Sequence, residues 1–218
     1  MKPLAILSLP NSGSTWLADT LAKVAGKELG SYYHEFFNPN QNHLMETELR
    51  RFFGGELASC YQNIARPSSP ELSEFIKQMW LESCHGFTKE VFSPFMIESF
   101  AETFRVVVLL RHTSGVFPPS RIRVWSFYEH AWQAMKDRGF RLQETTLRAK
   151  AYEAHFQMAR HMRETAISAK VPIIYYEDLF DDELIEGALV DAGLAYPGVV
   201  EELRNTRRLK KVRWDAVY

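Results

Sequence analysis

The first residues whose types and spacing could do chemistry form a short loop between an apolar run and an amphipathic segment. The loop is Pro10-Asn-Ser-Gly-Ser-Thr-Trp16, and the apolar run Leu4–Leu9 before it predicts a buried strand. The first N–H groups of a helix lack partners and its dipole favours anions, so hydroxyls and a glycine at this place are suited to a phosphate. An ordinary helix start, with Ser12 or Ser14 as N-cap, is the alternative.

A cation follows the clearest strand of the sequence. Arg105–Leu110 is a near-continuous apolar run after its first residue, typical of a parallel strand buried on both faces, and Arg111 comes directly after it. A guanidinium group suits a phosphate because it stays charged and donates two parallel hydrogen bonds. The alternative is that Arg111 only caps the sheet edge. Arg121 and Arg123 add positive charge nearby, although one of them could be a solvated helix residue.

Alternating strands and helices must position these groups. Short apolar runs predict strands at residues 4–9, 31–37, 86–92, 105–110 and 172–176. Amphipathic stretches predict helices at residues 15–25, 44–53, 70–84, 120–136, 142–168 and 181–193, the last ending near Gly193 as a left-handed cap. This order predicts an α/β fold with a parallel sheet covered on both faces, in which ligands bind at the carboxyl ends of the strands.

The loop after the first strand resembles that of a known family. The segment Pro10–Leu17 is similar to the 5′-phosphosulfate loop of sulfotransferases that use 3′-phosphoadenosine 5′-phosphosulfate (PAPS), whose pattern is close to P-K-S-G-T-T-W-L. The resemblance implies a three-layer P-loop-like fold over residues 1–218, with a central parallel sheet flanked by helices. It implies PAPS as the sulfuryl donor. The residues that would hold its 5′-phosphate are Asn11, Ser12, Gly13, Ser14 and Thr15.

Two positions of the loop leave alternatives open. Trp16 would lie against the adenine, or it is a core aromatic of the helix. Asn11 stands where many members of the family have a Lys that bridges to the leaving oxygen and the sulfuryl group. Asn carries no charge to offset developing negative charge, so either another cation, such as Lys89 or a nearby arginine, does this work, or the activity is weak or absent.

Three further segments resemble the family. Val106–His112 with Ser120 is similar to its 3′-phosphate site, and implies that Arg111 and Ser120 bind that phosphate. The segment around His34-Glu35-Phe36-Phe37 is similar to bacterial sulfotransferases of the trehalose-sulfating type, in which the Glu is the catalytic base. The segment Tyr176-Glu-Asp-Leu179 resembles a signature to which we assign a structural role only.

The resemblance makes Glu35 the first choice for the base, because a hydroxyl nucleophile needs a group that accepts its proton. His34 is the second choice, and alternation along a strand predicts that only one of the two faces the site. Lys89 is a candidate cation and Glu90 an alternative base on a strand where many members carry Lys or His. The alternatives are a strand-end salt bridge for Glu35 and a solvent-facing Lys89–Glu90 pair.

The net charge and the composition limit the kinds of binding partner that this chain can have. The chain carries 26 Lys and Arg against 27 Asp and Glu, a net charge of −1, which excludes a globally basic nucleic-acid binder. The histidines show neither H-x-H nor H-E-x-x-H spacing, so we expect no metal site. No signal peptide precedes the first strand and no apolar run reaches about 18 residues, which predicts a cytoplasmic protein without a membrane span.

The C-terminal region has a marked charge contrast. Nine acids and no cation lie between Ile173 and Leu203, and six cations follow within ten residues from Arg204. By resemblance, Arg207 and Arg208 in a basic segment at 204–218 would close over the 3′-phosphate; a solvated helix face is the alternative.

The sequence therefore predicts a PAPS-dependent sulfotransferase that acts on a hydroxyl or amine of a small molecule or glycan. Residues 41–84 are expected to form a helical cover over the acceptor. Two alternatives are kept: a nucleotide-binding relative that has lost catalysis, and a P-loop small-molecule kinase. The absence of a Gly-Lys pair in the loop argues against the kinase.

Overall fold

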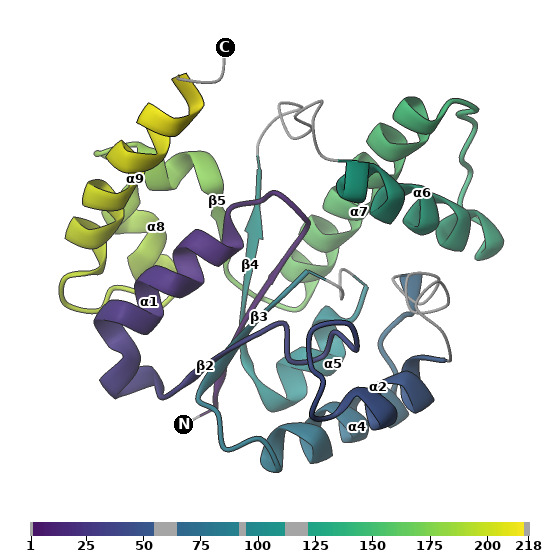
Figure 1. Ribbon diagram of the computed structural model, residues 1–218, viewed down its shortest axis with the longest axis horizontal. Helices are drawn as coiled ribbons and strands as arrows, with labels where there is room; N and C mark the ends of the chain where they lie inside the picture. Colours follow the sequence, from purple (N-terminus) through teal and green to yellow (C-terminus); the bar gives the residue numbers. More distant parts are fainter. Residues whose placement is uncertain (1, 55–64, 92–94, 112–121, 216–218) are drawn as a thin grey trace.

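Five parallel strands form one sheet, in the order β2-β3-β1-β4-β5 (Figure 1). The structure is a computed structural model that describes residues 2–54, 65–91, 95–111 and 122–215, without the side chains of 122–126 and 208–215. The strands are β1 (Leu4–Ser8), β2 (Tyr32–His34), β3 (Phe87–Glu90), β4 (Arg105–Leu110) and β5 (Ile173–Tyr175). In the central strand β1, Ile6 pairs with Lys89 on one side and with Val107 on the other.

Helices connect the strands and cover both faces of the sheet (Figure 1). On the face of Leu4 and Ile6 of β1, the core includes residues of α1, α8 and α9. On the face of Ala5 and Leu7 it includes residues of α2, α4, α5, α6 and α7. The helices are α1 (Ser14–Leu29), α2 (Glu46–Phe53), α4 (Pro70–Leu81), α5 (Ile97–Thr103), α6 (Ile122–Asp137), α7 (Leu147–Ser168), α8 (Ile185–Asp191) and α9 (Val199–Asp215).

Alternation along β1 explains these layers, because successive side chains of a strand point to opposite faces. Both faces are apolar and both are covered, as a parallel sheet requires. The three-layer α/β fold with a central parallel sheet, predicted from the alternating pattern and the resemblance, is confirmed. Within the described ranges, no helix is both long enough and apolar enough to cross a membrane.

Two helices lie where the sequence predicted none. The seven-residue α5 is shorter than the window of about 11–18 residues over which helical periodicity is recognised in a sequence. The helix α9 joins the end of the acidic stretch to the basic run, with Glu201 and Glu202 in its first turn. Acids at the start of a helix and cations at its end both complement the helix dipole, so the charge contrast of the sequence is a helix signal.

Other predicted elements differ at their ends. The long helix predicted from residue 142 begins at Leu147, because the Thr146 hydroxyl caps it by accepting from the N–H of Ala149 at 3.3 Å. The helix predicted at residues 181–193 is present but shorter, as α8 (Ile185–Asp191), and a 3-10 turn, η2 (Tyr176–Phe180), precedes it. Gly193 after α8 has a left-handed backbone (φ 66°), as predicted for a helix cap.

Candidate functional site

The loop from Leu9 to Gly13 turns β1 into α1 at the carboxyl end of the sheet. Asn11 (φ 66°) and Gly13 (φ 84°) both have left-handed backbones, which Gly and Asn adopt more readily than other residues. The N–H of Ser12 donates to the Leu9 carbonyl at 3.2 Å and closes the turn. Helix α1 then begins at Ser14 without a side-chain cap. The first N–H groups of a 16-residue helix are thus presented at the edge where ligands bind.

The serine hydroxyls in and around the loop differ in their hydrogen bonding. The Ser8 hydroxyl donates to Ser14 Oγ at 2.7 Å, and it also lies 3.4 Å from the carbonyl of Glu90. Ser12 is 3% exposed, and its Oγ has no hydrogen-bond partner within the described structure. Thr15 points to solvent. A buried hydroxyl without a partner is costly and points to a missing ligand or water.

Tyr176 supports this loop, although the sequence assigned its segment no chemistry. A Cβ placed on Gly13 would collide with the Tyr176 ring, so only glycine fits both the space and the left-handed backbone. The same ring lies against Arg111, whose Cζ is 4.2 Å from the ring centroid. Tyr176 begins η2 directly after the edge strand β5. In the sequence, this role was signalled by the place of Tyr176 at the end of a predicted strand and by the structural role assigned to the segment Tyr176–Leu179.

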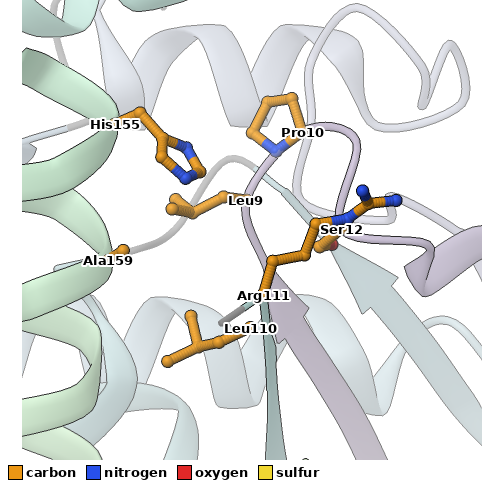
Figure 2. Close-up of a pocket in the computed structure, with 7 residues that line it drawn as sticks. All are labelled: Leu9, Pro10, Ser12, Leu110, Arg111, His155 and Ala159. Carbon is orange, nitrogen blue, oxygen red and sulfur yellow. The ribbon is translucent and has the colours of Figure 1, made fainter. Parts of the chain in front are cut away.

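Arg111 follows β4 and carries a second unpaired polar atom. Its Nε is buried and has no hydrogen-bond partner in the described part of the chain. Ser12 and Arg111 both line a small pocket between the loop, the end of β4 and helix α7 (Figure 2). The other lining residues are Leu9, Pro10, Leu110, His155 and Ala159. A hydroxyl and a guanidinium Nε without hydrogen-bond partners among the described residues are donors that suit an anion.

His155 of α7 lines the same pocket, and sequence reasoning missed it because no motif surrounds it. Its Nδ1 lies 2.8 Å from the hydroxyl of Tyr128, a fully buried residue of α6. That hydroxyl also lies 3.4 Å from the carbonyl of Pro10 in the loop. Burial, and secondly the charge of Arg111, lower the pKa of His155 to about 4. Burial also raises the pKa of Tyr128.

The second group of polar residues lies on β3 and at the end of β2. Lys89 is 2% exposed, and its Nζ donates to Glu35 Oε1 at 2.6 Å. The other oxygen of Glu35 accepts from Asn38 Nδ2 at 2.7 Å. The predicted base and the predicted cation therefore form one buried ion pair. The interpretation of Lys89 and Glu90 as a solvent-facing pair is wrong, because both are buried in the sheet.

His34 also belongs to this group, contrary to the prediction that strand alternation separates it from Glu35. Strand β2 ends at His34, and Glu35 adopts a left-handed backbone (φ 57°) that breaks the alternation. His34 Nε2 thus lies 3.5 Å from Glu35 Oε1, while its Nδ1 is 3.0 Å from the Tyr32 hydroxyl. Burial and the neighbouring Lys89 lower the pKa of His34. A strained non-glycine residue that orients a carboxylate is typical of a functional site.

Glu90, the alternative base, is fully buried on the opposite face of β3 from Lys89. Its Oε1 accepts from the Thr88 hydroxyl at 2.7 Å and from the N–H of Phe37 at 3.2 Å. Its Oε2 has no partner in the described ranges. Burial raises the pKa of Glu90 to about 8. A carboxyl that is protonated near neutral pH is poorly suited to accept a proton, so the geometry favours Glu35 over Glu90 as base.

The remaining predicted donor-binding residues lie elsewhere or outside the described part. Trp16 is 5% exposed, and its Nε1 donates to Thr206 Oγ1 of α9 at 2.7 Å, which matches the core alternative and leaves little ring surface for an adenine. Arg207 donates to Asp182 at 2.6 Å and to the carbonyl of Phe180 at 2.7 Å. Ser120 and the side chain of Arg208 lie outside the described residues.

No protein-family model matches the sequence, and no curated protein matches it either. Among solved structures, a sulfotransferase domain from the curacin biosynthetic pathway is similar to this chain, with 16% sequence identity and a TM-score of 0.42. The similarity covers 92% of this chain and 77% of that domain.

Proposed function

We propose that this protein is a sulfotransferase that moves a sulfuryl group from PAPS to a hydroxyl or amine of a small molecule or glycan. The observation that carries the proposal is the pair of unpartnered buried atoms, Ser12 Oγ and Arg111 Nε, in one pocket at the N-terminus of α1. These atoms fit an anion held at the carboxyl edge of a parallel sheet. The four segments that resemble the PAPS-dependent family support the choice of donor.

PAPS would supply an activated sulfuryl group, and this chain would hold the donor by its phosphates. The N–H groups at the start of α1 and the Ser12 hydroxyl would bind one phosphate, and Arg111 the other. Tyr176 keeps Arg111 in place by packing under its guanidinium group. Two separate phosphate contacts explain why cations concentrate at a few places in a chain of net charge −1.

Glu35 and Lys89 would act on the acceptor side. Glu35 would accept the proton of the acceptor hydroxyl, while Asn38 and Lys89 hold its carboxylate in position. Lys89 is also the described cation nearest to the proposed base, and it would take over the role for which Asn11 carries no charge. Helices α2 and α4, within residues 41–84, would cover the acceptor.

A specific observation also supports the second candidate, a nucleotide-binding relative without catalysis. Glu35 engages the ammonium group of Lys89 in a buried ion pair, and Asn11 supplies no replacement charge. If Lys89 cannot leave Glu35, developing charge on the leaving phosphate is not compensated.

One experiment separates the candidates. Transfer of radiolabelled sulfate from PAPS to a panel of glycans, alcohols and amines is measured together with the binding of adenosine 3′,5′-bisphosphate. Label on an acceptor, lost in Arg111→Gln, supports the sulfotransferase. Binding of the bisphosphate without transfer to any acceptor supports the non-catalytic relative. Thermal stabilisation by ATP with Mg²⁺, but not by the bisphosphate, would support a kinase and contradict both.

A further inference from the structure

Thr88 of β3 holds the backbone of the neighbouring strand β2 at the point where that strand ends (Figure 1). Its hydroxyl donates to the carbonyl of Tyr33 at 3.0 Å and accepts from the N–H of Phe36 at 3.3 Å. Thr88 is 0% exposed and Phe36 is 2% exposed, so bulk water does not compete for either contact. The two contacts bracket the residues between them, His34 and Glu35.

Glu90 continues this support two residues further along β3. Its Oε1 accepts from the N–H of Phe37 at 3.2 Å, and it shares the hydrogen of the Thr88 hydroxyl, 2.7 Å away, with the carbonyl that Thr88 contacts in β2. In the described part of the chain, the N–H groups of Phe36 and Phe37 donate to these side chains and to no backbone carbonyl. A buried N–H group that loses its partner is costly, so Thr88 and Glu90 hold the turn after β2.

This turn decides on which face of the sheet the Glu35 carboxylate lies. In β2, Tyr32 packs against the core on one face and Tyr33 against the core on the other. Continued alternation would place Glu35 on the face of Tyr33. Lys89 lies on the face of Tyr32, because Phe87, two residues earlier in β3, packs against the same core. The left-handed backbone of Glu35 (φ 57°) turns its carboxylate to Lys89, whose Nζ donates to Oε1 at 2.6 Å.

We propose that Thr88 and Glu90 are positioning residues for Glu35, because their side chains hold the strained turn that brings its carboxylate onto the face of Lys89. A left-handed backbone is unfavourable for a residue with a Cβ and persists only where surrounding contacts hold it. Thr88 and Glu90 fix the backbone of the turn from one face of β3, and Lys89, between them, binds the carboxylate on the other. The role in turnover rests on the proposed function, in which Glu35 is the base. The dependence of the Glu35–Lys89 pair on the two side chains does not.

Variants of nearly the same shape remove each contact in turn. Thr88→Val replaces the hydroxyl by a methyl group, and Thr88→Ser keeps the hydroxyl. Glu90→Met removes the acceptor of the Phe37 N–H, and Glu90→Gln keeps a carbonyl oxygen in its place. Thr103→Val is the matched control, because it makes the same change at a buried hydroxyl oxygen that has no hydrogen-bond partner in the described ranges. Either pair of variants tests the turn by itself if a member of the other pair does not fold.

The Glu35–Lys89 pair is measured first, without any sulfuryl transfer. Exchange of the Lys89 ammonium hydrogens with solvent, and of the two N–H groups of the turn, is followed by NMR. The ammonium group is 2% exposed and donates to a carboxylate, so its hydrogens exchange slowly in the unmodified chain. Thr88→Val and Glu90→Met should each speed this exchange by about tenfold or more, because the turn loses a buried hydrogen bond. Thr88→Ser, Glu90→Gln and Thr103→Val should keep it slow.

Turnover is then measured with a responsive acceptor. Thr88→Val should lower kcat on the order of 10- to 100-fold, because a displaced base no longer reaches the acceptor proton. KM for PAPS should stay unchanged, because no residue proposed to hold the donor is altered, and Thr88→Ser should restore most of the lost turnover. In a Glu35→Gln background, Thr88→Val should have little further effect, because both changes act on the same group. A side chain with a general structural role would lower kcat by the same factor in both backgrounds.

The proposal is overturned if the Lys89 ammonium group keeps its slow exchange in Thr88→Val and Glu90→Met. Fast exchange in Thr88→Ser, or an equal loss of kcat on Thr88→Val in the Glu35→Gln background, would also overturn it. If the unmodified chain transfers no sulfuryl group from PAPS, the proposed function fails, and hydrogen exchange decides whether the two side chains hold the Glu35–Lys89 pair. Transfer that depends on Glu35 but on neither Thr88 nor Glu90 overturns the positioning role alone.

Discussion

At the scale of single residues, the candidate site contains polar atoms that are buried without hydrogen-bond partners among the described residues. Ser12 Oγ and Arg111 Nε are of this kind, and each costs free energy in the absence of a ligand. Glu35 and Lys89, in contrast, satisfy one another in a buried ion pair. Under the proposed function, the first two atoms bind the donor and the pair acts on the proton of the acceptor. Substitutions of these residues should therefore separate binding from turnover.

Arg111→Gln should weaken the binding of adenosine 3′,5′-bisphosphate by about 1.5–3 kcal/mol, the contribution of a charged hydrogen-bond donor. Titration calorimetry measures this loss. Arg105→Gln is the matched control at the other end of β4, because Arg105 donates to the carbonyl of Gly193 and to Tyr196, away from the pocket. Unchanged affinity in Arg111→Gln would contradict its assignment to a phosphate.

Glu35→Gln should lower sulfuryl transfer on the order of 10²-fold or more, because it removes the proton acceptor. Nucleotide binding should stay unchanged, because Glu35 is not among the residues proposed to hold the donor. Initial rates with a responsive acceptor, together with bisphosphate affinity, measure the two effects. The exposed Glu164→Gln, which loses only a surface pair with Arg160, serves as control. Near-normal turnover in Glu35→Gln would move the base to His34 or Glu90.

At the scale of elements, the shape of the loop between β1 and α1 depends on close packing against η2. Gly13 lies against the ring of Tyr176, and the guanidinium group of Arg111 packs on the same ring. The loop, the end of β4 and the start of η2 are thus in contact, so that the position of the loop and that of the Arg111 guanidinium group are linked. A side chain at Gly13 would disturb both.

Gly13→Ala should destabilise the fold by at least about 1–2 kcal/mol, the cost of a left-handed backbone for a residue with a Cβ. Displacement of Tyr176 would add to this cost and weaken nucleotide binding. Gly26→Ala is the matched control within α1, where a Cβ meets no atom within 4 Å. It should stabilise the helix by about 0.5–1 kcal/mol. Urea unfolding measures both, and equal effects of the two substitutions would contradict the packing argument.

At the scale of the whole molecule, two buried titratable groups make the free energy of unfolding depend on pH. His155 acts as the pH falls toward 4, and Glu90 acts as the pH rises toward 8. Burial lowers the pKa of His155 from 6.5 to about 4, so the chain loses stability as the pH falls through this window. Burial raises the pKa of Glu90 from 4.5 to about 8. Its contribution is complete below pH 4.5 and is lost as the pH rises through 8.

Glu90→Gln should therefore flatten the alkaline side of the stability profile. The free energy of unfolding of the unmodified chain should fall between about pH 5 and 8, the interval between the unfolded and folded pKa values of Glu90, more steeply than that of the variant, because the buried Gln has no proton to lose. Urea unfolding at several pH values measures the slopes. Glu74→Gln, an exposed residue in a surface pair with Lys77, should keep the slope of the unmodified chain. Equal slopes in Glu90→Gln and the unmodified chain would show that Glu90 is not held protonated.

The charge distribution is also a property of the whole chain. The acidic and basic parts of the C-terminal region, which a linear view separates, meet in space where Asp182 pairs with Arg204 and Arg207. Arg207 thus stabilises the contact between α9 and the segment after η2. Its predicted role on the 3′-phosphate stays a prediction that requires Arg207 to leave Asp182.

The sequence by itself determined the local features of this protein. An apolar run, a Pro-Asn-Ser-Gly turn and a helix start follow one another within about 15 residues, and Asn and Gly are the residue types that most readily adopt the left-handed conformations found at Asn11 and Gly13. Arg111 at the end of a buried strand follows from the same kind of pattern. The order of strands and helices along the chain, one after the other, likewise determines the three layers of the fold.

Only the tertiary structure decided which of these residues meet. Glu35 and Lys89 are 54 positions apart and Tyr128 and His155 are 27 apart, so no sequence pattern encodes their contact. The left-handed kink at Glu35 overrode the alternation that would have separated it from His34. The pKa values of Glu90 and His155 depend on desolvation by the surrounding core. Desolvation sums over residues from many elements, and it exists only once they pack.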